Sequence, residues 1–310
     1  MHNTKKVQVK TLLIDSSNLI YRIWWINKAK KLSDNEDTFT VYMFLRSLRS
    51  YVQKYPSDRI ISVWDKRLSY PEKNFRKENT EGEYKGTRSH DNVEDVYRHT
   101  DKIVELLESL GVYNMFPDRM EGDDVIAWLS DQNNQSVIVS ADHDMYQLVT
   151  TTTKVYNPIK KVEVNSVNFD DVTGVDVDDF VLYKSLIGDK SDNIKGLPRV
   201  GKKTALKYIA NWDETKRTLS ESNLQQLADN IKLVDLRYGY NYYDTETASY
   251  NEQYVQQEGI VNYNKSKFLK LCKEHNLQSI LKDTSWPEPF SHGVEDAVVS
   301  VIEALGLEHK

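Results

Sequence analysis

Short apolar runs alternate with longer amphipathic segments through the first half of the chain. The runs are typical of buried strands, which we expect at residues 7–15, 59–65, 112–116 and 136–140. The segments between them carry apolar residues at helical spacing and predict helices at 18–29, 38–55, 93–110 and 122–129. A short hairpin is expected from residue 154 to residue 164. Strands that alternate with helices in this way predict an α/β fold with a parallel-rich central sheet.

The second half of the chain has a different pattern, because the strand signal disappears near residue 175. Four helices are expected there, at residues 178–187, 201–211, 223–236 and 265–275. We therefore expect an α/β domain over residues 1–175, a helical region over 176–285 and a tail over 286–310, in which residues 294–305 predict a last helix. A polar, charged stretch at about 66–100 is a long insertion in the first domain, and such insertions are commonly functional.

Composition restricts the class of protein. With 310 residues, of which 39% are hydrophobic and 28% charged, the chain has enough apolar material for a large core and is not intrinsically disordered. No apolar run approaches the ~18 residues of a membrane span, and no apolar segment follows the N-terminal lysines as in a signal peptide. The single cysteine, Cys272, cannot form an internal disulfide. We expect a cytoplasmic monomer with no membrane partner.

Charge is unevenly distributed along the chain. The net charge of −6 argues against a nucleic-acid-binding protein, which is usually basic. Residues 193–207, however, hold five basic side chains and no acid, and residues 66–88 are also rich in lysine and arginine. Many acids stand in short sets elsewhere. Segregation of this kind is typical of a metal site beside phosphate-binding surfaces.

Nine acidic residues are candidates for that metal site: Asp15, Asp65, Glu121, Asp123, Asp124, Asp142, Asp144, Asp189 and Asp192. Asp15, Asp65 and Asp142 fall at the carboxyl ends of predicted strands, which share one edge of a parallel sheet. Taken singly, such acids are more commonly solvated or helix-capping residues. Taken together, oxygen ligands without His or Cys suit Mg²⁺ or Mn²⁺, and converging carboxylates need cations to offset their repulsion. Two such ions side by side are a known arrangement for phosphodiester hydrolysis.

The motifs that hold these acids resemble the 5′-nuclease family, also called flap endonucleases, and within it the stand-alone bacteriophage 5′-exonucleases. The similar segments are LLIDSSNLIYR (12–22), SVWDK (62–66), EGEYKGTR (81–88), EGDD (121–124), SADHD (140–144), GDKSDNI (188–194) and GLPRVGKKTA (196–205). They occur in family order and cover most of residues 11–210. The resemblance implies a PIN-like α/β nuclease domain, an arch over the active site, and a helix-3-turn-helix region that binds duplex DNA.

The resemblance also implies roles for the acids around two Mg²⁺ or Mn²⁺ ions. The more tightly held ion would be surrounded by Asp15, Asp65, Glu121, Asp123 and Asp142. The second ion would be served, partly through water, by Asp144, Asp189 and Asp192, and Asp124 would assist one or both ions.

Four other residues of the motifs would act on the substrate. By the resemblance, Lys85 would stabilise the charge that develops on the scissile phosphate, and Arg88 and Arg22 would bind phosphates beside it. Tyr84 would stack on an unpaired base. The alternatives are an ordinary solvated lysine and a packed tyrosine.

The basic turn, residues 195–207, would hold the backbone of the duplex without reading its sequence. The residues assigned to this contact are Lys195, Arg199, Lys202, Lys203 and Lys207. The family often binds K⁺ through carbonyls of this turn, which here correspond to Leu197 and Val200. Arg199 stands where the family commonly has glycine, a departure that bears on the geometry of the turn.

The expected function is a structure-specific, metal-dependent 5′-3′ exonuclease and flap endonuclease that leaves 5′-phosphates by a two-metal mechanism. Its substrates would be branched or flapped DNA and RNA–DNA hybrids such as primers. It would act in DNA replication. Single-strand-binding protein or a sliding clamp would be partners, and a phage protein would work in the host cytoplasm. Two alternatives stay open: a PIN-type ribonuclease, which shares the strand-end acids, and a branched-DNA-binding protein without catalysis.

Overall fold

The computed structural model describes residues 9–30, 36–65, 75–80, 83–86, 96, 98–133, 135–243, 247 and 263–291. The predicted last helix at 294–305 and the placement of Arg88 lie outside these ranges, as does most of the predicted insertion at about 66–100.

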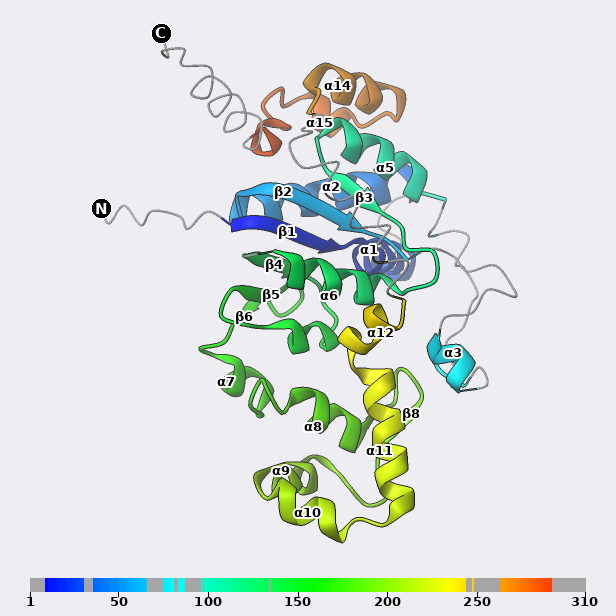
Figure 1. The fold of residues 1–310 in the computed structure, drawn as a ribbon. Coiled ribbons are helices and arrows are strands. Elements are labelled where there is room, and N and C mark those ends of the chain that lie inside the picture. Colours follow the sequence, from blue (N-terminus) through cyan, green and yellow to red (C-terminus); the bar gives the residue numbers. More distant parts are fainter. Residues whose placement is uncertain are drawn as a thin grey trace.

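A six-stranded sheet forms the centre of the structure, in the order β3-β2-β1-β4-β5-β6 (Figure 1). The strands are β1 (Val9–Asp15), β2 (Ser57–Val63), β3 (Tyr113–Met115), β4 (Ser136–Val139), β5 (Thr153–Asn157) and β6 (Val162–Val164). Neighbouring strands from β3 to β5 run parallel, and β6 is antiparallel to β5. The predicted α/β class with a parallel-rich sheet is therefore confirmed.

The two faces of the sheet bury separate hydrophobic clusters, because side chains alternate along a strand. In β1, Leu12 and Ile14 belong to one cluster and Leu13 to the other, and all three are fully buried. The first face is covered by α1 (Ser16–Lys30), α2 (Glu36–Lys54) and α5 (Thr100–Ser109). The second face is covered by α6 (Gly122–Gln132), the 3₁₀ helix η1 (Asp144–Leu148) and α7 (Phe169–Thr173). Within the described ranges, no helix has the length and apolar character to cross a membrane.

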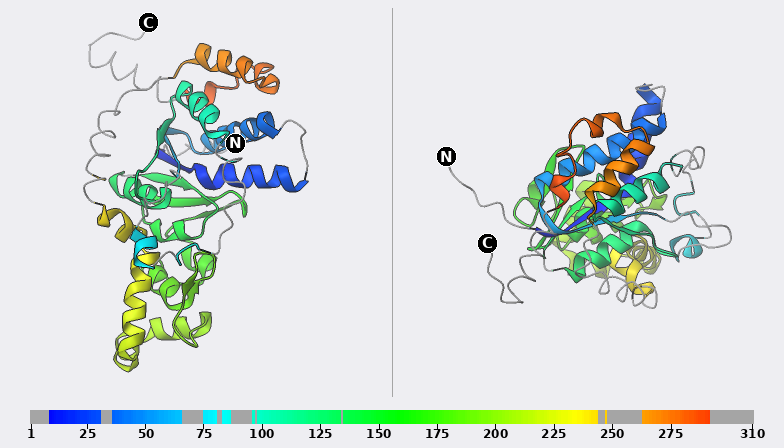
Figure 2. Two further views of the ribbon diagram at one scale, coloured as in Figure 1. Left: turned by 90° about the vertical axis from the view of Figure 1, so that its right-hand side faces the viewer. Right: turned by 90° about the horizontal axis from the view of Figure 1, so that it is seen from above.

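A helical lobe follows the sheet and projects away from it (Figure 2). It contains α8 (Phe180–Ile187), α9 (Lys202–Ala210), α10 (Trp212–Thr218) and α11 (Glu221–Val234), around a small core that includes Leu186, Leu197 and Leu227. Two short strands, β7 (Gly188–Asp189) and β8 (Ile194–Lys195), reverse the chain between α8 and α9. After α11, α12 (Leu236–Tyr242) returns to the sheet domain and packs on α6. The helix α3 (Phe75–Asn79), from the long insertion, lies against α12 through Phe75.

The last described segment does not belong to the helical lobe, to which the sequence pattern assigned it up to residue 285. Helices α14 (Lys265–Glu274) and α15 (Gln278–Leu281) and the 3₁₀ helix η2 (Glu288–Phe290) pack on the face of the sheet covered by α2 and α5. Trp286 stacks between Phe268 and Phe290, and its carbonyl accepts from Arg49 Nε of α2 at 2.8 Å. The periodicity of α14 identified an apolar helix face, but only the fold shows which surface that face covers.

Candidate active site

Hydrogen bonds from neighbouring loops fix the strand-end carboxylates of β1 and β2. Asp15 accepts from the Ser140 hydroxyl at 2.6 Å and from the backbone N–H of Asn18 at 3.1 Å. Asp65 accepts from the backbone N–H of Gly122, the first residue of α6, at 2.7 Å. The ends of β1, β2 and β4 and the start of α6 therefore meet at one edge of the sheet, as the strand-end positions of the acids predict.

Negative charge accumulates at this edge, and the Lys85 ammonium offsets only part of it. Burial raises the pKa of Asp15 to about 7, and repulsion from Asp65 and Asp142 contributes to the rise. Burial likewise raises the pKa of Asp65. Burial, together with the charges of Asp15 and Asp142, raises the pKa of Asp123 well above its usual value. A cation bound among these carboxylates would relieve both the desolvation and the repulsion.

Glu121 differs from its neighbours because the protein itself neutralises it. Its Oε1 accepts from Lys85 Nζ at 2.9 Å, and its Oε2 accepts from Arg76 Nη1 at 3.3 Å and from the Tyr84 hydroxyl at 3.1 Å. Burial alone would raise the pKa of Glu121, but the charges of Lys85 and Arg76 outweigh it and lower that pKa to about 2. Glu121 thus holds the Lys85 ammonium at the margin of the acid cluster.

Asp124 forms a buried ion pair with Arg76. Arg76 Nη1 and Nη2 donate to the two oxygens of Asp124 at 2.8 and 2.6 Å, and both side chains are 1% exposed. Asp124 Oδ2, the partner of Nη1, also accepts from the backbone N–H of Glu121 at 3.2 Å. Asp124 thus holds Arg76 in this structure, and the guanidinium already offsets its charge. No sequence pattern singles out Arg76, which lies in a polar stretch without periodicity.

Tyr84 is packed in the interior and does not face solvent. Its side chain is 4% exposed and lies with Ile194 and Val234. Its hydroxyl oxygen is 3.1 Å from both Asp192 Oδ2 and Glu121 Oε2, which share its single proton. A ring in this position cannot stack on a base, which corrects the stacking role expected from the sequence and matches the packed-tyrosine alternative. The reason is that the helical lobe supplies an apolar socket for the ring.

A second acid set, formed by Asp144, Asp189 and Asp192, lies between η1 and the helical lobe. Lys184 of α8 contacts Asp144 Oδ1 at 2.7 Å and Asp189 Oδ2 at 2.5 Å. Burial raises the pKa of Asp144 to about 6, with further repulsion from Asp142. Burial acts in the same direction on Asp189, but its hydrogen bonds to Lys184 and Ser191 prevail and lower its pKa to about 2. Lys184 carries no signal in the sequence, because no local pattern distinguishes it from a surface lysine of a helix.

The donor set fits a hard divalent cation, although the acids are not gathered into a closed ligand set. In the ranges that the structure covers, no group of three or more His, Cys, Asp or Glu side chains is arranged to hold an ion. The candidates nevertheless offer oxygen donors without nitrogen or sulfur, as Mg²⁺ and Mn²⁺ prefer. Burial and mutual repulsion raise their pKa values, and at Asp65 and Asp123 the charge of Lys85 offsets the rise only in part. Burial also lowers the pKa of Arg22, and the charges of Tyr51 and Asp15 act against that lowering.

The basic turn of the helical lobe is exposed and rigidly braced. All five of its predicted phosphate-binding side chains are exposed, namely Lys195, Arg199, Lys202, Lys203 and Lys207. Arg199 has a φ of 65°, so it adopts the left-handed conformation in which glycine is common. From α11, Asn230 Nδ2 donates to the carbonyls of Ser185 and Lys195 at 2.9 and 2.8 Å. Arg199 therefore takes the backbone conformation that glycine commonly provides, in spite of its side chain.

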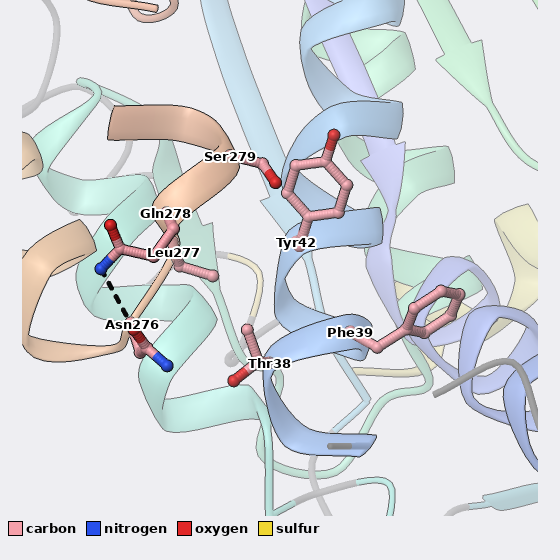
Figure 3. Close-up of a pocket in the computed structure, with 7 residues that line it drawn as sticks. All are labelled: Thr38, Phe39, Tyr42, Asn276, Leu277, Gln278 and Ser279. Atoms are coloured by element: carbon pink, nitrogen blue, oxygen red, sulfur yellow. Dashed lines mark hydrogen bonds between the residues drawn. The ribbon is translucent and has the colours of Figure 1, made fainter. Parts of the chain in front are cut away.

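A pocket of about 200 Å³ lies elsewhere, between α2 and the α14–α15 connection (Figure 3). Its lining residues are Thr38, Phe39, Tyr42, Asn276, Leu277, Gln278 and Ser279. None of them is an acid, a lysine or an arginine, so this pocket offers neither a carboxylate to a metal ion nor a positive charge to a phosphate. The candidate site is therefore the acid cluster.

A parallel sheet with buried acids at its carboxyl edge, a lysine held beside them and an exposed basic hairpin together define a nucleic-acid hydrolase. A family model described as the 5′-3′ exonuclease N-terminal resolvase-like domain matches residues 10–174. The chain therefore belongs to the 5′-3′ exonuclease family, as the motifs predicted.

Individual relatives agree with this assignment. The chain is 28% identical to a 5′-3′ exonuclease of Aquifex aeolicus over 291 residues, which are 89% of this chain and 95% of that protein. It is 31% identical over 227 residues to the thermostable DNA polymerase I of Thermus thermophilus, covering 72% of this chain but only 26% of the polymerase. Among solved structures, the T5 5′-exonuclease with divalent zinc ions matches with a TM-score of 0.62 at 19% identity, over 86% of this chain and 98% of that one. Flap endonuclease-1 from Methanococcus jannaschii matches with a TM-score of 0.55 at 11% identity, over 93% and 94%. These two matches confirm the PIN-like 5′-nuclease fold.

Proposed function

We propose that this chain is a divalent-metal-dependent, structure-specific 5′-nuclease that hydrolyses phosphodiesters near the 5′ ends of branched or flapped DNA. The observation that carries the proposal is the cluster of buried and half-buried carboxylates at the sheet edge, whose pKa values are raised by burial and mutual repulsion, with the Lys85 ammonium held beside it by Glu121. Cations and a scissile phosphate are the two partners that this combination of charges requires. The product would carry a 5′-phosphate.

The residues around the first ion would be Asp15, Asp65, Asp123 and Asp142, with Glu121 at its margin. The second acid set, Asp144, Asp189 and Asp192, would serve a second ion, with Lys184 exchanging its contacts for those of the metal. When bound, the two Mg²⁺ or Mn²⁺ ions would supply the activated water and stabilise the leaving oxygen. Asp124 is assigned to the Arg76 ion pair, because both of its oxygens are already engaged.

Lys85 would act on the reacting phosphate itself. Its pKa is raised well above the usual value despite burial, chiefly by the charge of Glu121, so it carries a proton at neutral pH. A fixed ammonium next to the phosphate offsets the negative charge that grows during attack, and it does so more strongly in the transition state than in the ground state. Arg22, and Arg88 by the family motif, would bind the phosphates on either side.

The basic turn would grip the duplex part of the substrate. Exposed lysines and an N-terminal helix end hold phosphates without reading bases, so affinity would be independent of sequence and sensitive to salt. The left-handed φ of Arg199, a conformation open to glycine, supports a K⁺ site at the Leu197 and Val200 carbonyls. This exposed basic turn favours a 5′-nuclease over the PIN-type ribonuclease alternative.

The biological substrates that suit this chemistry are flaps and RNA primers, including RNA–DNA hybrids, in DNA replication. Single-strand-binding protein or a sliding clamp would be its partners. The T5 flap endonuclease has been solved with both DNA and metal ions on a related fold, at a TM-score of 0.61 and 20% identity. That complex supports a DNA substrate here.

The test is single-turnover cleavage of a 5′-labelled flap as Mg²⁺ is increased, together with equilibrium binding of the same flap. Asp142→Asn should keep the fold and the binding but lose most of the cleavage, and it should reduce the thermal stabilisation that Mg²⁺ confers. Asp101→Asn, at an exposed position of α5, is the matched control and should change neither. Binding without cleavage in the unmodified protein, at any Mg²⁺ concentration, would show the non-catalytic DNA-binding alternative to be right.

A further inference from the structure

The turn that carries Lys85 is docked on the helical lobe. The backbone N–H of Lys85 donates to the carbonyl of Asp192 at 3.0 Å, and Asn193 Nδ2 donates to the carbonyl of Glu83 at 2.9 Å. These two bonds join the turn of residues 83–86 to the loop between β7 and β8, and each side supplies one donor and one acceptor. The Glu83 carbonyl also accepts from the N–H of Gly86 at 3.0 Å, so one oxygen closes the turn and anchors it.

Both sides of this interface have left-handed backbone. Lys85 has a φ of 53° and Asn193 a φ of 60°. For a lysine this conformation is uncommon and persists only where surrounding contacts impose it, whereas asparagine tolerates it well. On the backbone side, the contacts that support this conformation of Lys85 come from Asp192 and Asn193, while Glu121 holds the far end of its side chain at 2.9 Å.

The loop that provides these contacts is itself firmly held. It closes the β7–β8 hairpin, in which Gly188 pairs with Lys195 and Asp189 with Ile194. Asp189 Oδ1 accepts from the backbone N–H of Ser191 at 2.7 Å and from its hydroxyl at 2.5 Å. The loop is thus a rigid platform, and it belongs to the helical lobe and not to the insertion that carries Lys85.

We propose that Asn193 is a positioning residue, whose side-chain amide docks the turn of residues 83–86 on the β7–β8 loop and so fixes Lys85 relative to the acid cluster. The inference rests on the proposed function, in which Lys85 acts on the phosphate. It adds that the helical lobe, which would grip the duplex, also sets the place of this lysine.

Asn193 suits this role by its chemistry. A backbone carbonyl can only accept a hydrogen bond, so the group facing Glu83 must be the amide N–H₂. Asn193→Gly removes the amide but keeps the left-handed backbone, and it adds no charge near the acids. Asn193→Asp keeps the shape but replaces the donor by a carboxylate that would face the Glu83 carbonyl unfavourably. The two variants share only the loss of the amide donor, since Asn193→Gly adds chain flexibility and Asn193→Asp adds charge. A similar fall in cleavage rate in both would therefore be due to the lost donor.

The experiment measures single-turnover cleavage at saturating flap, flap affinity and melting temperature for both variants. We expect the cleavage rate to fall by about tenfold or more, the scale of misplacing a reacting group by a fraction of an ångström to an ångström. Affinity and melting temperature should change little, because the basic turn and the core are untouched. Asn276→Gly is the matched control, since Asn276 is exposed, has a φ of 56° and lies in the distant α14–α15 connection.

The decisive step repeats Asn193→Gly in a Lys85→Ala background. If Asn193 acts through Lys85, the second substitution should have almost no further effect on the rate, whereas independent effects would multiply. Normal cleavage by Asn193→Gly, or an undiminished effect in the absence of Lys85, would overturn the inference while leaving the proposed function in place. Normal cleavage by Lys85→Ala alone would instead refute the role of Lys85 in the proposed function, and the inference with it.

Discussion

Replacing Arg76 by methionine tests whether the buried Arg76–Asp124 pair holds the base of the insertion on the sheet domain. The guanidinium is 1% exposed and donates through both terminal nitrogens to Asp124. Its Nε donates to the Leu233 carbonyl at 2.9 Å, so the same side chain links α3, α6 and the end of α11. Methionine retains most of the apolar arm and removes the charge and all of these donors.

The expected loss in the free energy of unfolding follows from the burial of Asp124, the partner of Arg76. Two unit charges at about 4 Å attract by about 4 kcal/mol at an effective dielectric constant of ~20. Removing one member of a buried pair leaves the other charge without compensation, at a cost of about 3–5 kcal/mol. We therefore expect Arg76→Met to lower the free energy of unfolding by about 3–5 kcal/mol. The double variant Arg76→Met/Asp124→Leu should recover much of that loss, because no unpaired carboxylate then remains at position 124.

The measurement is urea unfolding in EDTA, followed by tryptophan fluorescence, for the unmodified protein, the two single variants and the double variant. The unmodified protein should be the most stable, the double variant should be less stable, and Arg76→Met should be less stable than the double variant. A loss below about 1 kcal/mol for Arg76→Met would be typical of an exposed pair and would contradict the buried geometry. A double variant less stable than Arg76→Met would show that Asp124 is stabilising for a reason other than its partner.

Three further outcomes are expected. Replacing Lys202 and Lys203 together by Ala should weaken flap binding for all sequences alike and reduce the slope of log K against log[salt] by about two; an unchanged slope would remove these lysines from the phosphate contact. Gly239→Ala should lower the urea midpoint without removing any charge, because a Cβ at 239 would come within 2.0 Å of Asp124 Oδ1, and an unchanged midpoint would contradict that close approach. Lys184→Met should lower the melting temperature more in EDTA than in Mg²⁺, because the metal would replace the lysine charge between two acids; an equal loss in both conditions would argue against a cation there.

The sequence by itself determined the layers of the fold and the edge at which the chemistry lies. Apolar runs that end in Asp15 and Asp65 predict buried parallel strands, and parallel strands bring their carboxyl ends to one edge. The observed strands β1 and β2 agree with those runs to within about two residues, and both acids lie at that edge. This succeeded because strand periodicity and strand-end position are local properties of the chain.

Only the tertiary structure decided how the charges are paired and which surfaces meet. Arg76 and Asp124 are 48 residues apart, and Tyr84 and Asp192 are 108 apart, so no local pattern joins them. The same holds for α14, whose apolar face could have covered any complementary surface and in fact covers α2 and α5. A buried charge is stable only beside a specific partner, and that partner is fixed when distant segments pack. For this reason nine acids that look equivalent in the sequence divide into those that the protein neutralises, such as Glu121 and Asp124, and those whose charge is left for a cation, such as Asp15 and Asp123.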